Sequence, residues 1–181
     1  LEEAHLERAK LEEAVFGNTN LTGAHLSEVT LADIDLGSCG LARITLMKSR
    51  LVRVAIVDRD MSRANLSGAT LVHCTLKNVN LAGANLSGCM FLFCLLENCT
   101  LEGASCVDAN FGLSCIVRTR FDTADLTRAS FSCAMMEDVS IRRSILDHAD
   151  MTLVQARRLD ITGSRQQGLV VERARVQGLV R

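Results

Sequence analysis

The sequence predicts an all-β solenoid, a rod of stacked square coils in which five residues form each side. From Leu1 to Val176 every fifth residue is apolar, and Gln166 is the one exception among 36 such positions. Two residues before each of them the side chain is usually small, most often Ala or Cys. Lys, Arg, Asp and Glu occupy the other three positions of the period, apart from Arg59 and the terminal Arg181.

A fivefold period excludes the regular alternatives, because a helix repeats its buried face every 3.6 residues and a strand every two. We call Leu1 and every fifth residue after it the lumen positions. The small-residue position lies two residues before a lumen position, and the turn position lies two residues after it. Four sides of five residues close a coil of 20, with the lumen side chains inside. About nine coils stacked at the spacing of β-strands, roughly 4.8 Å, would form a rod on the order of 40 Å long, a single domain over residues 1–181.

Glycine placement supports this geometry independently of hydrophobicity. A four-residue corner that starts at a lumen position has the turn position third, where a type II turn requires a positive φ and favours glycine. Corners without glycine are expected to use other turn types. Eight of the twelve glycines lie at turn positions: Gly23, Gly68, Gly83, Gly88, Gly103, Gly163, Gly168 and Gly178.

Three segments need separate interpretation. Residues 1–16 are rich in helix formers, so a short N-terminal capping helix is an alternative to a first coil, although the fivefold register favours the coil. In residues 41–60, Arg59 occupies a small-residue position, where an unpaired guanidinium is too costly. We expect it to swing outward or to pair with Asp58 or Asp60, with a local distortion of the coil. Three phenylalanines 20 residues apart should stack inside the rod: Phe91, Phe111 and Phe131.

Several segments resemble the pentapeptide repeat proteins, whose unit is Ala, then Asp or Asn, then Leu, then two variable residues. They are RANLSGA (63–69), AGANLSGC (82–89), DANFG (108–112), TADLTRA (123–129) and HADMT (148–152). The resemblance covers essentially the whole chain. It implies a right-handed quadrilateral parallel β-helix. It implies little about activity, because the family includes gyrase-binding DNA mimics, secreted effectors and modules of unknown role.

The eight cysteines do not indicate disulfides or zinc, since no C-x-x-C pair is present. Six occupy inward positions where Ala also occurs, which predicts reduced core thiols and a cytoplasmic protein. Cys115 and Cys133 face outward and should be the more reactive thiols. The sequence predicts no membrane-spanning run and no signal peptide. Because the chain begins with Leu rather than Met, we expect it to be a fragment of a longer protein.

One strip of the predicted surface carries apolar residues at outward positions, which are otherwise mostly polar. It runs over several coils, as a partner site would. We predict an intermolecular interface there, homodimeric in the first instance, with cover by a missing domain as the alternative. The candidate residues are Val72, Met90, Leu92, Phe93, Leu95, Leu113, Cys115, Cys133, Met135 and Leu153.

The last coil is a second candidate interface, because an uncapped end of a solenoid presents apolar side chains and unpaired backbone. Gln166 stands at a lumen position here, which makes this coil irregular. The candidate residues are Leu169, Val170, Val171, Leu179 and Val180.

No set of residues predicts catalysis, a cofactor or a metal site. His5 and His25 are expected to lie one above the other on adjacent coils, without an acid–base or nucleophilic set converging on them in a pocket. The predicted function is therefore a non-enzymatic protein–protein interaction scaffold, such as the repeat domain of a bacterial effector or secretion adaptor delivered by a secretion system. The alternative is a DNA mimic that binds gyrase or topoisomerase. Direct binding of nucleic acid is not expected, because the arginines are scattered without aromatic residues between them.

Overall fold

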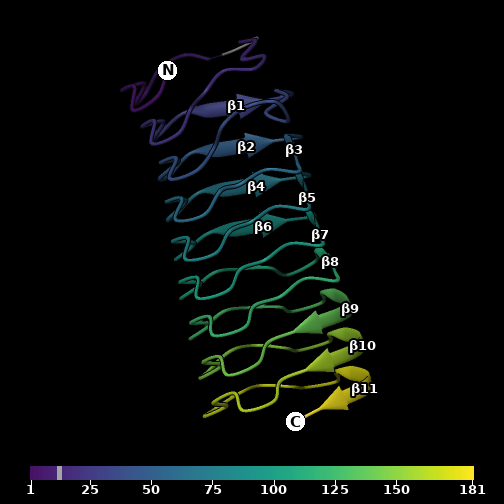
Figure 1. Ribbon diagram of the computed structural model, residues 1–181. Coiled ribbons are helices and arrows are strands. Elements are labelled where there is room, and N and C mark those ends of the chain that lie inside the picture. Colours follow the sequence, from purple (N-terminus) through teal and green to yellow (C-terminus); the bar gives the residue numbers. More distant parts are fainter. Residues whose placement is uncertain (12–13) are drawn as a thin grey trace.

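A computed structural model describes residues 1–11 and 14–181 and shows a rod of stacked four-sided coils, with the two termini at opposite ends (Figure 1). Each coil takes 20 residues, because every parallel strand pair joins residues 20 apart, as in Leu51 with Leu71 and Ile116 with Met136. Among the described residues there is no helix. Residues 1–11 lie in the first coil, where Leu6 N–H donates to His25 O at 2.8 Å. The predicted all-β quadrilateral solenoid is thus confirmed, and the capping-helix alternative is wrong for the described residues.

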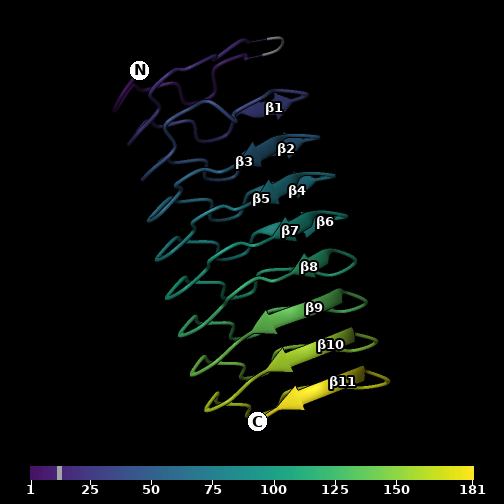
Figure 2. The same ribbon diagram turned by 45° about the vertical axis from the view of Figure 1, so that its right-hand side comes forward.

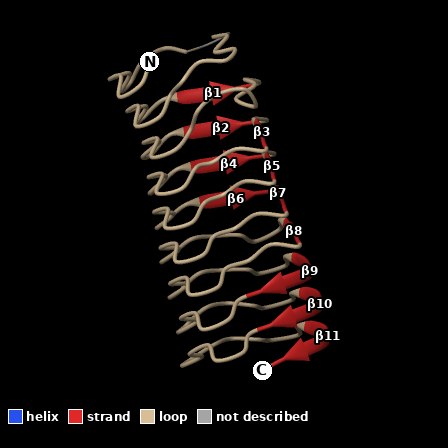
Figure 3. Ribbon diagram, in the orientation of Figure 1, coloured by secondary structure: helices blue, strands red, loops and turns tan. Residues whose placement is uncertain are grey.

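Strands form two of the four sides, and the other sides consist of turns and isolated bridges (Figure 3). The first sheet has the order β1-β2-β4-β6, and the second has the order β11-β10-β9-β8-β7-β5-β3. The first contains β1 (Thr30–Ala32), β2 (Arg50–Val52), β4 (Thr70–Val72) and β6 (Met90–Leu92). The second contains β3 (Ala55–Val57), β5 (Thr75–Lys77), β7 (Leu95–Glu97), β8 (Cys115–Val117), β9 (Met135–Ser140), β10 (Gln155–Asp160) and β11 (Arg175–Val180).

The lumen is filled along the rod by side chains from equivalent positions of successive coils. Met61, Leu81 and Leu101 are fully buried, and Leu81 N–H donates to Thr100 O at 2.7 Å, one coil further on. The phenylalanine column is present as predicted. The Phe111 ring stacks on those of Phe91 and Phe131, with centroids 4.8 and 5.2 Å away.

The corners depart from the sequence-based prediction. Arg43 at a turn position has a φ of +57°, and Ile44 N–H closes the turn by donating to Leu41 O at 3.2 Å. Positive φ holds at every described turn position except Asn18 and Ser38, whether or not the residue is glycine. The expectation that corners without glycine use another turn type is therefore wrong. The interstrand ladder forces each coil to follow its neighbour's path, so glycine in one coil and arginine in the next take the same conformation.

Polar residues at small-residue positions bind the corner of the preceding coil. Ser114 is buried; it accepts a hydrogen bond from Cys94 N–H at 3.1 Å and donates to Phe91 O at 2.9 Å. Ser49 makes the equivalent contacts with Val29 N–H and Leu26 O. Each hydroxyl binds the carbonyl 23 residues before it and the N–H 20 residues before it, which belong to one corner of the preceding coil. This explains why Ser and Thr occur among the alanines.

Arg59 takes the first of its two expected arrangements. Its side chain is half-buried and turns outward, where Nε donates to Val57 O at 3.1 Å. Asn80 N–H donates to Arg59 O at 3.0 Å, so the ladder continues through this residue. Asp58 and Asp60 instead accept hydrogen bonds from the Asn78 and Asn80 side chains of the next coil.

Candidate interaction surface

The predicted strip lies along the corner where the first sheet meets the second. Four turn positions, one per coil, form its centre: Phe93, Leu113, Cys133 and Leu153. Val72, Met90 and Leu92 flank them on one side, and Leu95, Cys115 and Met135 on the other. We call these ten residues the apolar edge. Figure 2 shows the stacked strands β7 to β10, each of which follows one of these turn positions.

Much of the apolar edge is open to solvent. The exposed fractions are 54% for Phe93, 54% for Leu113, 56% for Met135 and 43% for Leu153. Met90 and Cys133 are also exposed, whereas Val72, Leu92, Leu95 and Cys115 are half-buried. His73 occupies the equivalent turn position one coil before Phe93. Its ring stacks on that of Phe93, with centroids 5.3 Å apart.

The central residues of the apolar edge are unfavourable for the isolated rod in two respects. Phe93 has a φ of +55° and Leu113 a φ of +59°, a region that residues with a Cβ adopt at a cost. Their side chains also remain in water. Glycine would avoid both costs, and a polar residue would avoid the exposure of apolar surface to water.

A shallow groove adjoins the apolar edge on the outer face of the second sheet. It has a volume of about 480 Å³ and shares Cys115 and Met135 with the apolar edge. Its remaining walls carry both charges, from Glu137, Arg157 and Arg175. The apolar edge therefore passes on one side into a polar concave surface that resembles the rim of a protein interface.

The second candidate surface is the C-terminal end of the rod. Strand β11 pairs with β10, and its other edge faces away from the stack. Side chains of the last coils line a pocket of about 270 Å³ that opens at this end. Gln166 is half-buried and donates to Ser164 O at 3.3 Å. Leu169 is half-buried, whereas four other candidate residues are exposed: Val170, Val171, Leu179 and Val180.

Acidic side chains on the rod are regularly paired with arginine from a neighbouring coil. Arg53 Nη2 lies 2.5 Å from Asp33 Oδ2, and Arg128 Nε lies 2.6 Å from Asp108 Oδ1. These hydrogen bonds hold the pKa values of both aspartates below their ordinary values. The paired columns therefore present mixed charge rather than a run of negative charge.

One cluster of side chains has ligand chemistry, and sequence reasoning found only part of it. His5 and His25 stack with ring centroids 4.7 Å apart, as their spacing of 20 predicted. Glu7 approaches both rings, with its Oε1 3.0 Å from His5 Nδ1 and 4.0 Å from His25 Nδ1. Glu7 lies two residues from His5, on the same outward side of the coil. That short spacing was the available sequence signal.

The cysteines lie as the sequence predicted. Six are buried, Cys115 is half-buried and Cys133 is exposed, and all eight are free thiols. Burial raises the pKa of Cys99 to about 11 and that of Cys89 to about 12. Cys89 and Cys99 are therefore packing groups.

Comparison with known proteins agrees with this geometry. The sequence matches the family described as pentapeptide repeats, with 8 copies of the repeat, over residues 1–37, 60–91 and 104–143. The chain belongs to the pentapeptide repeat family. No curated protein matches it closely enough to count as a relative. Among the described residues of this pentapeptide repeat protein, no helix has the length and apolarity needed to cross a membrane.

Solved structures of other pentapeptide repeat proteins are similar to it. HetL, involved in heterocyst differentiation regulation in the cyanobacterium Nostoc sp. strain PCC 7120, has a TM-score of 0.54 and 23% identity, over 98% of this chain and 89% of HetL. QnrB1, a plasmid-mediated fluoroquinolone resistance protein, has a TM-score of 0.40 and 13% identity, over 90% of each chain. A protein of the Arabidopsis thaliana thylakoid lumen has a TM-score of 0.29 and 25% identity, over 70% of this chain and 68% of that one. The likeness to HetL is a likeness of fold.

Proposed function

We propose that this pentapeptide repeat protein is a non-enzymatic interaction scaffold that self-associates through its apolar edge. The observation that supports this most directly is the central column, which runs over four successive coils and exposes three large apolar side chains and the thiol of Cys133. Apolar surface that runs over several elements marks an interaction site more reliably than scattered exposed residues do.

A second copy of the chain is the occupant that fits the shape of this surface. The four turn positions repeat at the constant spacing of the coils, so they form a straight row. A straight and evenly spaced row is complementary to itself when one copy is turned end for end, as a twofold interface requires. In such an antiparallel pair Phe93 would face Leu153 of the second copy, and Leu113 would face its Cys133.

The interface is expected to be small. Ten residues per copy is below the 20 to 30 of a standard protein–protein interface. We therefore expect a reversible dimer with a Kd of about micromolar or weaker, which forms as the protein concentration rises.

Sedimentation velocity across a range of protein concentrations tests this proposal. The wild-type chain should shift from monomer to dimer, and Phe93→Asp with Leu113→Asp should remain a monomer, because two carboxylates would be buried without partners. The control is Thr123→Asp with Arg143→Asp, which places two aspartates at turn positions of the diagonally opposite corner. It makes the chain more negative than the test variant does, so an effect of net charge alone would appear in it. A wild-type chain that stays monomeric, or a control that also loses the dimer, would overturn the proposal.

The pairing of acids with arginine counts against the DNA-mimic alternative. A mimic needs carboxylates that repeat like phosphates with no counter-charge between them, whereas Asp33 and Asp108 each bind an arginine. We expect no inhibition of DNA gyrase supercoiling at micromolar protein. The roles predicted from the sequence as an effector or a secretion adaptor stay predictions.

A further inference from the structure

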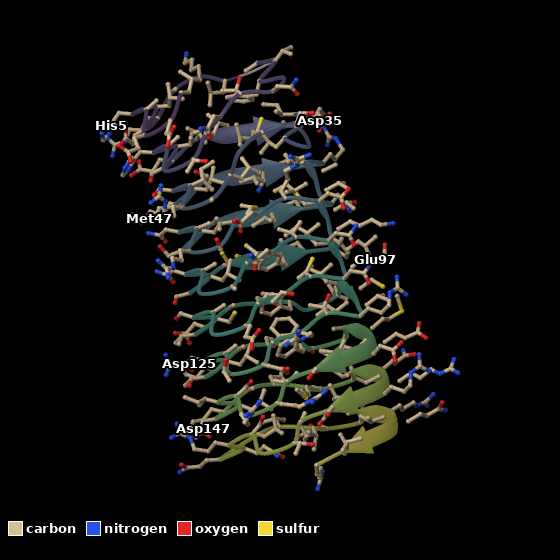
Figure 4. The ribbon with its side chains drawn as sticks, in the orientation of Figure 1. His5, Asp35, Met47, Glu97, Asp125 and Asp147 are labelled. Carbon is tan, nitrogen blue, oxygen red and sulfur yellow. The ribbon has the colours of Figure 1, made fainter. Side chains whose placement is uncertain are left out.

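The N-terminal end of the rod carries two histidines and a glutamate whose ligand atoms converge. His5 and His25 occupy equivalent positions of the first and second coils and form a parallel bridge, with His25 N–H donating to Ala4 O at 2.9 Å. Their rings are nearly parallel, with 11° between the planes. Glu7 Oε1 lies beside both Nδ1 atoms, and all three ligand atoms are within 4.8 Å of one another. Figure 4 labels His5 at this end of the rod.

This donor set matches the chemistry of a zinc site. Zn²⁺ binds imidazole nitrogen at about 2.0–2.1 Å and carboxylate oxygen at about 2.0–2.2 Å, usually with four ligands in a tetrahedron. Donor atoms in such a site lie roughly 3.3 Å apart, as follows from those bond lengths. The two stacked rings would have to turn so that their Nδ1 lone pairs, which lie in the ring planes, converge on the ion. The backbone ladder already holds the two histidines in register.

Glu7 also differs from neighbouring acids in its partners. Glu28, one coil further on, is bound by Arg8, whose Nε lies 2.8 Å away. Glu7 faces two imidazoles instead, at 3.0 Å from His5 Nδ1 and 4.0 Å from His25 Nδ1. A carboxylate that lies between two imidazoles is a suitable anionic ligand for a divalent cation.

We propose that His5, Glu7 and His25 bind one Zn²⁺, with water completing the coordination, and that the ion clamps the first coil to the second. In the described residues the first coil packs against the second coil, and its lumen residues are less buried than those of the second and third coils. Leu1 is 59% exposed, whereas Leu21 and Leu41 are buried. A coil whose lumen side chains are less buried gains less from stacking, so a link to its neighbour has more effect there. This proposal departs from the absence of a metal site that the sequence predicted, and it does not depend on the proposed dimer.

Isothermal titration calorimetry with ZnCl2 tests the site. The full chain is used without a tag and carries Cys115→Ser and Cys133→Ser, so that accessible thiols do not bind the ion. We expect one Zn²⁺ per chain, with affinity falling in acid, because protons compete with the ion for imidazole nitrogen. Each of His5→Ala, His25→Ala and Glu7→Gln should weaken binding at least about tenfold, since loss of a supporting residue alone costs that much.

Two further variants keep the result interpretable. The control carries His73→Ala and His148→Ala, which remove exposed histidines elsewhere, and it should bind as the parent does. His25→Cys should retain binding, because a thiolate is also a zinc ligand. In the parent, Zn²⁺ should slow hydrogen exchange of the amides of Leu6 and His25, which link the two coils.

Failure to bind at millimolar Zn²⁺ would overturn the proposal. So would undiminished binding by His25→Ala, or loss of binding by the control. If Zn²⁺ binds but exchange at Leu6 and His25 is unchanged, the clamp is wrong.

Discussion

Arg128 lies one coil beyond Asp108 and binds both oxygens of its carboxylate, with Nε 2.6 Å from Oδ1 and Nη2 2.7 Å from Oδ2. Both are turn-position residues, 20 apart in the sequence. The same forked contact joins Arg53 to Asp33 and Arg158 to Asp138. Neighbouring coils are therefore linked by ion pairs outside the rod as well as by apolar contacts inside it.

The Arg128 and Asp108 pair predicts a stability difference that depends on pH. The hydrogen bonds from Arg128 lower the pKa of Asp108 below 3.8, its ordinary value. Its contribution is therefore fully present above that value and is lost as the pH falls through the lowered one. In urea titrations, Arg128→Ala should have a lower midpoint than the wild type at pH 7, and the difference should vanish in strong acid. Arg143→Ala, an arginine outside these pairs, is the control. An equal deficit at both pH values would mean that packing, not charge, makes the difference.

The Ser114 hydroxyl should stabilise the corner of the preceding coil. Ser114→Ala leaves Cys94 N–H buried without its acceptor, so we expect a loss of about 1–3 kcal/mol in the free energy of unfolding. Ser114→Cys should lose less, because a thiol retains weak hydrogen bonding. Ser62→Ala, on the half-exposed surface, should change stability by no more than about 0.5 kcal/mol. If Ser114→Ala is as stable as the control, the hydroxyl has no such role.

Thiol labelling should separate the cysteines by burial. With iodoacetamide at neutral pH, Cys133 is expected to react first. Cys115 should follow slowly, because partial burial raises its pKa. The other six should react only after unfolding in urea. Mass spectrometry of the native and unfolded protein gives the count, and Cys133→Ser should remove the fast step. Rapid native labelling of Cys89 or Cys106 would contradict the filled core.

Glycine substitutions should have opposite effects at neighbouring residues of one corner. Arg43 has a φ of +57°, so Arg43→Gly should stabilise the protein by about 0.5 kcal/mol, as the gain from relieved strain exceeds the added entropy of the unfolded chain. Ala42→Gly should destabilise it by about 0.5–1 kcal/mol. Urea midpoints measure both changes, and two changes of the same sign would contradict the assigned backbone conformation.

Gly88 provides the reverse substitution. Its φ is +66°, and an added Cβ would meet nothing nearer than Gly68, at 4.0 Å. Gly88→Ala should therefore cost about 1 kcal/mol through backbone strain alone. No loss of stability by urea titration would mean that strain at the corners is smaller than the φ values imply.

The columns of the rod could be predicted from the sequence because they depend only on counting. A fivefold period and a 20-residue coil place Phe111 between Phe91 and Phe131, and place Leu113 next to Phe93 on the outside. No side-chain conformation enters that argument. The same counting located the apolar edge and the buried thiols.

Features that depend on torsion angles could not be predicted in this way. The positive φ of Arg43 contradicts local preference, since the stacked neighbours impose it. The approach of Glu7 to His25 depends on side-chain rotamers of both residues. The sequence allows two arrangements of Arg59, and the outward one is present. Its acceptor, the backbone carbonyl of Val57, cannot be recognised from the sequence because every residue has a carbonyl.

The unbroken 20-residue register has a consequence for how such a chain changes in length. Removing or duplicating 20 residues would keep each residue in contact with an equivalent position of the adjacent coil, so whole coils can be lost or gained. Deleting one group of five, by contrast, would turn everything downstream through a quarter rotation. A deletion of 101–105 would move Leu113 and Leu153 to the preceding corner of the coil, while Phe93 would stay where it is. The apolar edge would then be divided between two faces.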